Sequence, residues 1–186
     1  MKLFNAGKNR RSIRLKEYDY SKDGLYFVTI SCSNNTHFFG EIVEGKMNLN
    51  SIGQIARDEW LRTAEIRNYV VLHEFIVMPN HVHMIIELCS EKQIQQTIVI
   101  QTSSKTIGSI VRGYKIAVIK KIKLEANNYV IQRKKENDIE DKIPWSYIHA
   151  CAYKIWHRNY YECIIRDERA YSNISKYIRD NPKRWQ

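Results

Sequence analysis

The chain has 186 residues, of which 44% are hydrophobic, so it is long enough for one domain with a buried core and does not have the composition of a disordered protein. Thirty Lys and Arg against 20 Asp and Glu give a net charge of +10, which favours an anionic partner, and the 21 aromatic residues (12 Tyr, 5 Phe and 4 Trp) favour nucleic acid over a membrane surface. No apolar run approaches the roughly 20 residues of a membrane span, and the N-terminus lacks an apolar signal core, so we expect a cytoplasmic protein.

A basic arm and three short strands are predicted for the first 50 residues. Residues 25–32 alternate loosely between β-branched and aromatic types, as in a strand, and residues 37–43 and 46–49 flank the Glu44-Gly45 turn of a hairpin. Residues 1–20 are poor in apolar side chains and carry three arginines that contact either phosphates or solvent: Arg10, Arg11 and Arg14. Four aromatic residues are expected in the core: Tyr26, Phe27, Phe38 and Phe39.

The hydrophobic period then changes to that of a helix and back to that of strands. Residues 51–67 place apolar side chains at steps of three and four, which predicts a helix capped by Asn50 or Ser51. Residues 69–77 and 81–88 predict two antiparallel strands joined by a short turn that contains a proline.

Two histidines begin the second of these strands, in the run His81-Val82-His83. Because positions two apart in a strand share a face, both imidazoles point the same way. Such a pair can bind a divalent ion when a third ligand joins it, although on spacing alone it is more often a surface or hydrogen-bonded core feature. His73, in the preceding strand, has no ligand spacing and is expected to be structural.

A basic amphipathic helix follows, capped by Ser103 or Ser104. Arg112 and Lys115 lie outside its apolar stripe, so the helix either follows a phosphate backbone or faces solvent, and the net charge favours the first interpretation. Residues 125–150 lose the helical period and carry mixed charge, which predicts a loop insertion with room for a helical piece. The apolar stripe of the basic helix consists of Ile107, Ile110, Val111, Tyr114, Ala117 or Val118, and Ile122.

The end of the chain places a tyrosine and an asparagine together. Residues 156–166 predict a turn and a strand, and Asp167 caps a final helix that Pro182 stops. Tyr177 and Asn181 are four residues apart and are therefore neighbours on one side of this helix.

The element order predicts a single α+β domain over residues 1–186. The predicted order is strand, hairpin, helix, two strands, helix, strand and helix. This order suits an antiparallel sheet with the helices packed on one face, which is the ferredoxin-like (RRM-like) architecture. In such a sheet the strand of His81 and His83 is central. A helix over that strand would bring Tyr177 and Asn181 to the two histidines.

These residues resemble a known family. His81-Val82-His83 is similar to the His-hydrophobic-His motif of HUH endonucleases, and Tyr177-x-x-x-Asn181-Pro182 is similar to the tyrosine helix of REP-associated tyrosine transposases. The resemblance spans most of residues 25–185, including the segments YFVTISC, FGEIV, SIVRGYK and WHRNYYECIIRDE. It departs at His157, where glutamine is expected, and in the long segment 125–150.

The resemblance implies a metal-dependent endonuclease and strand transferase that cleaves single-stranded DNA near a hairpin, in DNA transposition and recombination. Tyr177 would be the nucleophile and form a 5′-phosphotyrosine. Mg²⁺ or Mn²⁺ would be held by His81, His83 and Asn181. The protein would associate with the nucleoid when bound to DNA, and both a monomer and a homodimer remain open. The residues expected to contact DNA are Arg10, Arg11, Arg14, Arg112, Lys115 and Arg158.

The alternative is a non-catalytic module of the same ferredoxin-like shape. Aromatic residues on its sheet would stack the bases of single-stranded DNA or RNA without cleavage. That interpretation accounts for the charge and the aromatic content, but not for the coincidence of His81, His83, Tyr177 and Asn181.

Overall fold

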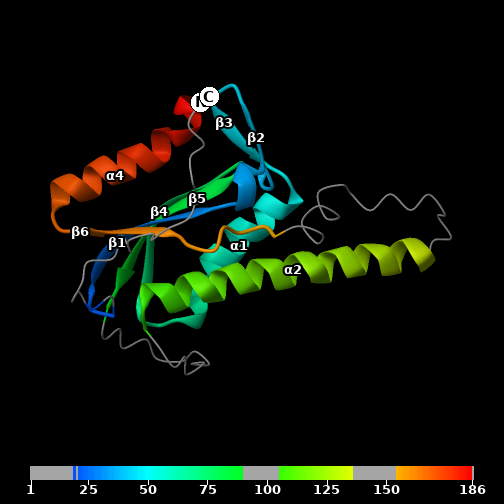
Figure 1. Ribbon diagram of the computed structural model, residues 1–186, viewed down its shortest axis with the longest axis horizontal. Coiled ribbons are helices and arrows are strands. Elements are labelled where there is room, and N and C mark those ends of the chain that lie inside the picture. Colours follow the sequence, from blue (N-terminus) through cyan, green and yellow to red (C-terminus); the bar gives the residue numbers. More distant parts are fainter. Residues whose placement is uncertain (1–18, 20, 90–104, 136–153, 186) are drawn as a thin grey trace, which may run out of the picture.

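The computed structural model describes residues 19, 21–89, 105–135 and 154–185. These residues form an α+β fold in which helices lie on both sides of one sheet (Figure 1). The basic arm predicted for residues 1–20, with Arg10, Arg11 and Arg14, lies almost wholly outside the described residues. The elements in chain order are β1 (Gly24–Ser31), η1 (Ser33–Asn35), β2 (Gly40–Val43), β3 (Lys46–Leu49), α1 (Ser51–Ile66), β4 (Val70–Met78), β5 (His81–Leu88), α2 (Ile107–Lys135), β6 (Tyr161–Ile165), α4 (Glu168–Asp180) and η2 (Asn181–Arg184).

The main sheet has four strands in the order β4-β5-β1-β6, and each neighbouring pair is antiparallel. β5 pairs with both β4 and β1, so the strand that carries His81 and His83 is central, as predicted. β2 and β3 form the predicted hairpin, in which Gly45 takes a φ of 71°. The strand order and the two crossing helices are those of a ferredoxin-like domain, which confirms the predicted fold class.

The three main helices are capped by side chains. Asn50 caps α1 and Asp167 caps α4, each accepting a hydrogen bond from the backbone amide three residues on, at 2.9 Å and 2.7 Å. At the start of α2 the hydroxyl of Thr106 accepts from the amide three residues on, at 3.2 Å. The predicted caps Ser103 and Ser104 lie outside the described residues.

One face of the sheet and the helices α1 and α2 enclose the main core. Every second residue of β1 and β5 points to this side, because strand side chains alternate between faces. The two helices meet at Trp60 and Tyr114, whose ring centroids are 5.6 Å apart, and the Tyr114 hydroxyl donates to the Ala56 carbonyl at 3.0 Å. The predicted core aromatics buried on this side are Tyr26, Phe38 and Phe39.

The last helix covers the opposite face, which corrects the expectation that all helices share one face. α4 packs against β4 and β5, and Ile178 forms a second, smaller core with Ile85 and Ile165. Figure 1 shows α4 on one side of the sheet and both α1 and α2 on the other. The amphipathic pattern of α4 specifies that one side of the helix is buried, but not which face of the sheet receives it. β5 accepts helices on both faces because Met84 and Ile85 point to opposite cores.

A bulge in β4 adds polar contacts to the docking of α4. The register of β4 against β5 shifts between Leu72 and Phe75, which lets neighbouring residues reach α4. The Glu87 carboxylate accepts from Nε2 of His73 at 2.9 Å, and Nδ1 of that ring lies 3.1 Å from the Tyr171 hydroxyl. His73 therefore has the structural role predicted for it.

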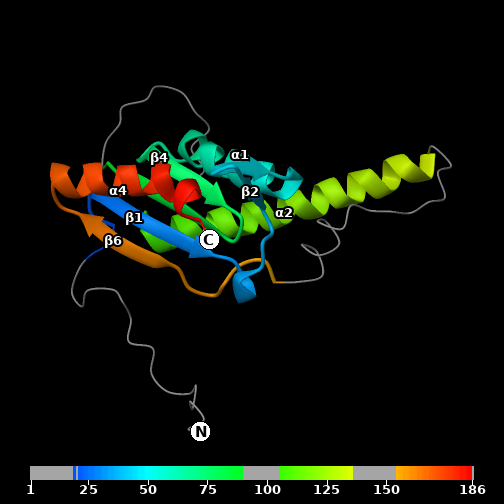
Figure 2. The same ribbon diagram turned by 90° about the horizontal axis from the view of Figure 1, so that it is seen from above.

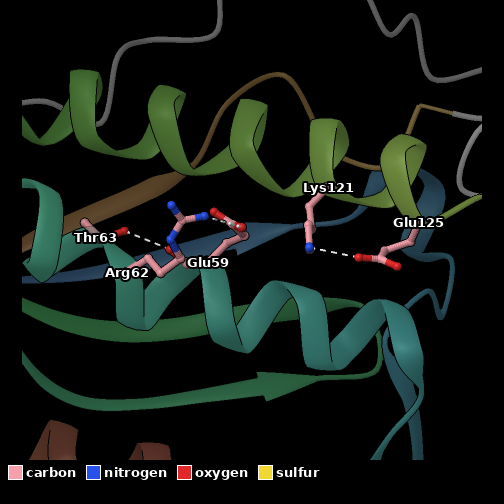
Figure 3. A network of polar contacts seen from close by, with 5 residues as sticks. All are labelled: Glu59, Arg62, Thr63, Lys121 and Glu125. Carbon is pink, nitrogen blue, oxygen red and sulfur yellow. Dashed lines mark hydrogen bonds and ion pairs between the residues drawn. The ribbon is translucent and has the colours of Figure 1, made fainter. Parts of the chain in front are cut away.

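α2 continues to Lys135, so residues 125–135 of the predicted insertion are helical, and the prediction left room for a helical piece there. The helix extends past the sheet (Figures 1 and 2). Glu125 pairs with Lys121 one turn earlier, at 2.8 Å, which supports this part of the helix (Figure 3). Residues 136–150 lie outside the described part of the chain.

Replacing Trp60 with alanine is expected to lower the free energy of unfolding by ~3–5 kcal/mol, because it empties the space between α1 and α2. Trp60 is only 1% exposed, and its indole N–H has no acceptor among the described residues. Trp60→Phe is the matched control: it retains a ring and removes an unsatisfied donor, so it should cost clearly less. Urea denaturation measures both, and equal losses would contradict this packing.

Candidate catalytic site

His81 and His83 lie at the start of β5, on the face that α4 covers. Val82 between them points into the main core, so both histidines point the other way, as the sequence predicted. Their ring centroids are 4.4 Å apart. The turn before them is joined to the end of β1, because the Asn80 carbonyl accepts from the Cys32 amide at 2.7 Å.

Tyr177 reaches this pair from α4. Its hydroxyl oxygen lies 3.2 Å from Nε2 of His83, and the centroids of the two rings are 5.2 Å apart. The helix is fixed at this point because Ile178, the next residue, is fully buried. The Tyr177 side chain itself is 39% exposed, so part of it can be reached from solvent. A tyrosine and a histidine 94 residues apart in sequence thus meet within one chain.

Each histidine has one ring nitrogen held by a neighbouring side chain. Nδ1 of His81 lies 2.7 Å from Oδ1 of Asn80, which can only accept, so this nitrogen donates. Nδ1 of His83 lies 2.8 Å from the hydroxyl of Thr29, which can also accept. With both Nδ1 atoms donating, both Nε2 atoms keep a lone pair. In this tautomer Nε2 of His83 accepts from the Tyr177 hydroxyl, whereas Nε2 of His81 is buried without a partner among the described residues.

Thr29 and Asn80 also belong to the site, and neither was predicted from the sequence to do so. Thr29 is directly opposite His83 in the register of β1 and β5, and this relation becomes visible only when the two strands are aligned. Asn80 lies in the short turn predicted between the two strands. Its position immediately before His81 is the one signal from which its contact with that ring could have been expected.

Burial lowers the pKa of both imidazoles. The pKa of His81 falls to about 4, and that of His83 falls to about 3 because burial is joined by the effect of the adjacent His81. Both rings are therefore neutral at pH 7, and each keeps the lone pair that a cation needs.

Asn181 ends α4 and begins η2. It is 8% exposed and keeps helical backbone angles (φ −55°, ψ −44°) although a proline follows it. It lies one turn after Tyr177, as predicted, and its side chain makes no hydrogen bond within the described residues. η2 is held against the β2–β3 hairpin, where the backbone of Lys183 lies beside Gly45. The ring of Trp185 then packs 5.8 Å from that of His81, centroid to centroid.

The residues present fit a divalent cation at the two Nε2 atoms. A ligating histidine commonly has its other ring nitrogen held by a neighbouring group, and Asn80 and Thr29 hold the Nδ1 atoms in this way. Among the described residues no cluster of three His, Cys, Asp or Glu side chains is present, so a third ligand from the protein would be an amide such as that of Asn181. Such a set of donors carries no charge.

The basic residues predicted to contact DNA are dispersed over the fold. Arg112 and Lys115 lie on α2, on the face of the sheet opposite Tyr177. The Lys115 ammonium donates to the carbonyls of His157 and Asn159, at 2.9 Å and 3.2 Å. Lys115 thus secures the segment before β6, and burial, together with nearby Lys154, lowers its pKa to about 8. Arg158, in that segment, is exposed.

Two solved structures are similar to this chain in fold. The solved structure of a REP-associated tyrosine transposase bound to a REP hairpin is 18% identical to this chain, covers 94% of this chain and 74% of its own, and has a TM-score of 0.53. This likeness confirms, for the fold, the resemblance drawn from the sequence. A second structure, of a candidate transposase from Deinococcus radiodurans, is 15% identical over 90% of this chain and 95% of its own, but its TM-score of 0.39 carries no argument.

The chain belongs to one family with an uncharacterised protein of Haemophilus influenzae. The two are 35% identical over 193 residues, which cover 98% of this chain and 94% of that protein. No family model matches the chain. None of the described helices combines the length and apolar composition that crossing a bilayer requires.

Stability toward denaturant is expected to fall as the pH is lowered from about 6.5 toward about 4. In the folded chain the pKa values of His81 and His83 are about 4 and about 3, against 6.5 for an ordinary histidine, so the unfolded chain binds more protons in this range. Above pH 6.5 both histidines are neutral in the folded and in the unfolded chain, so their full contribution to the free energy of unfolding is present. Each histidine changes the free energy of unfolding by at most about 1.4 kcal/mol per pH unit.

Urea denaturation with chelator present, at pH values between about 7 and about 4, measures this dependence. The variant His81→Gln/His83→Gln should lose less stability on acidification than the wild type. Parallel losses in the two proteins would show that other groups govern the acid sensitivity.

Proposed function

We propose that the protein is a metal-dependent endonuclease and strand transferase of the transposase type, acting on single-stranded DNA with Tyr177 as its nucleophile. The observation that carries the proposal is the 3.2 Å contact between the Tyr177 hydroxyl and Nε2 of His83, beside the buried and unpartnered Nε2 of His81. The fold shared with a REP-associated tyrosine transposase supports this class, and the REP hairpin bound to that protein favours a hairpin substrate here.

The chemistry is a transesterification. The Tyr177 oxygen attacks the phosphorus of a phosphodiester, an O–P bond to tyrosine forms, and the bond to the 3′ oxygen breaks. The phenol loses a proton, and the departing 3′ oxygen gains one. One DNA end then remains attached as a 5′-phosphotyrosine, and the other ends in a 3′-hydroxyl. Because phenolate is a better leaving group than an alkoxide, a 3′-hydroxyl can reverse the step and join a new strand.

His81, His83 and Asn181 would hold Mg²⁺ or Mn²⁺, and the ion would polarise the phosphate oxygens. Burial keeps both imidazoles neutral for this role. Nε2 of His83 has a single lone pair, which cannot bind a cation and accept the Tyr177 hydrogen bond at the same time. Metal binding should therefore release the Tyr177 hydroxyl, while α4 keeps it close to the site.

The contact between Tyr177 and His83 within one chain supports a site that a single subunit completes. The net charge of +10 supports DNA as the partner, and exposed Arg112 and Arg158 stay candidates for phosphate contacts. Since Arg112 lies on the face opposite Tyr177, its contacts would be made away from the cleavage point.

The purified protein is expected to form a denaturation-resistant adduct with the 5′ end of a cleaved single-stranded oligonucleotide that contains a hairpin. Tyr177→Phe should remove both adduct and cleavage, because it deletes the attacking oxygen and leaves the ring in place. His81→Ala and His83→Ala should each abolish cleavage but retain most DNA binding. Denaturing gels of oligonucleotides labelled at either end measure these outcomes. Wild-type protein that binds the strand without cleaving it would favour the non-catalytic module.

Thr29→Val should weaken Mn²⁺ binding by about 10- to 100-fold, because the valine cannot accept the Nδ1 hydrogen bond that orients His83. Thr29→Ser is the matched control, since it keeps the hydroxyl and should bind nearly as the wild type does. Calorimetric titration with Mn²⁺ near pH 7.5 measures the affinity without any need for catalysis. Equal affinity of the valine and serine variants would show that this contact does not orient the ring.

A further inference from the structure

Part of the sheet face that carries His83 is not covered by α4. The helix packs mainly on β4 and β5, and Ile165 of β6 belongs to the small core beneath it, whereas other parts of β1 and β6 extend past its edge, as Figure 2 shows from the side of α4. β6 pairs with β1 alone among the described strands, so it forms one edge of the sheet. Side chains of β1 and β6 that point to this face therefore lie beside the candidate catalytic site.

A row of residues crosses this open area at the level of the histidines. Thr29 of β1 is paired with His83 on one side and with Tyr161 of β6 on the other. Paired residues in neighbouring strands point to the same face, and strands are about 4.8 Å apart. Tyr161 thus lies about two strand spacings, roughly 10 Å, from His83, on the same face.

Aromatic rings connect Tyr161 with the tyrosine on α4. The ring of Phe27 lies 6.2 Å from that of Tyr161 and 6.3 Å from that of Tyr177, centroid to centroid, and meets both edge-on. Phe27 was predicted to be a core residue, and it is in fact half-buried and packed on the smaller core. Tyr161 is 42% exposed, so it presents an aromatic surface to solvent while Phe27 supports it.

An exposed aromatic ring beside a site for phosphodiester chemistry suits an unpaired base. Single-stranded nucleic acid is commonly held by stacking of its bases on aromatic side chains, next to basic groups that contact the backbone. Arg158 and Arg166, both exposed, flank β6 in sequence and supply positive charge at its two ends. Bases inside a hairpin stem are already stacked, so such a surface would select the unpaired flank of the substrate.

We infer that Tyr161, supported by Phe27, is a stacking platform for an unpaired DNA base close to the phosphate that Tyr177 attacks. The inference rests on the proposed function, because its ligand is the single-stranded part of the same substrate. Tyr161 has a positioning role: it fixes the strand beside the site and takes no part in bond formation.

The test compares Tyr161→Leu with Tyr161→Phe, both in a Tyr177→Phe background that binds DNA without cleaving it. The probes are a hairpin with a single-stranded flank and the same hairpin without it, and 2-aminopurine is placed in turn at each flank position. Tyr161→Leu should weaken binding of the flanked hairpin by about 5- to 150-fold, and Tyr161→Phe should leave it nearly unchanged, because only the ring is needed. Binding of the unflanked hairpin should be the same in all variants. Proteins with Tyr or Phe at position 161 should quench 2-aminopurine at one flank position, and this quenching should disappear in Tyr161→Leu.

Equal affinity of the leucine and phenylalanine variants for the flanked hairpin, with circular dichroism showing both folded, would overturn the platform. If wild-type protein still forms the covalent adduct in that case, the proposed function stands and only the platform fails. If wild-type protein neither binds nor cleaves the flanked hairpin, the proposed function and the platform both fail.

Discussion

The docking of α4 against β4 and β5 determines where the Tyr177 hydroxyl lies. The Arg179–Glu74 ion pair between helix and strand, at 2.7 Å, has side chains 55% and 32% exposed, so it contributes at most about 1 kcal/mol. Ile178 is completely buried, and burying such a side chain contributes about 1.5–3 kcal/mol. Apolar contact therefore supplies most of the stabilisation, and the polar contacts at the β4 bulge fix which turn of the helix faces which strand. Because Ile178 and Tyr177 are adjacent, the apolar contact also fixes the tyrosine beside His83.

The two faces of the sheet have different roles. The face under α1 and α2 holds the larger core, built around residues such as Trp60 and Tyr114, and supplies most of the stability. The other face has a smaller core, and beside it the Tyr177 side chain stays 39% exposed. Strand alternation makes this division possible, because Val82 can anchor β5 in the main core while the histidines on either side of it point to the opposite face. The predicted ion would thus be held on a strand whose other side is rigidly packed.

Much of this arrangement could be predicted from local sequence patterns. The strand alternation, the turn before His81 and the four-residue spacing of Tyr177 and Asn181 are local features, and each is present in the structure. No local sequence pattern specifies which side of the sheet α4 covers, because an amphipathic helix fits any apolar surface. For residues 125–135 the sequence left room only for a helical piece and did not give the extent of the helix, and Thr29 was missed because its partner lies on another strand. Hydrophobic pattern thus identified the elements and the candidate residues, whereas the contacts between elements required the three-dimensional fold.

The most direct test of Tyr177 as the nucleophile is to identify the residue that carries DNA after cleavage. The covalent adduct is digested with nuclease and trypsin, and the peptides are sequenced by tandem mass spectrometry. Trypsin cuts after Lys176 and Arg179, so Tyr177 lies in a short peptide that contains no other tyrosine. We predict that the added nucleotide mass is found on this peptide alone. A nucleotide on the peptide that contains Tyr160 and Tyr161, or on any other tyrosine, would contradict the assignment.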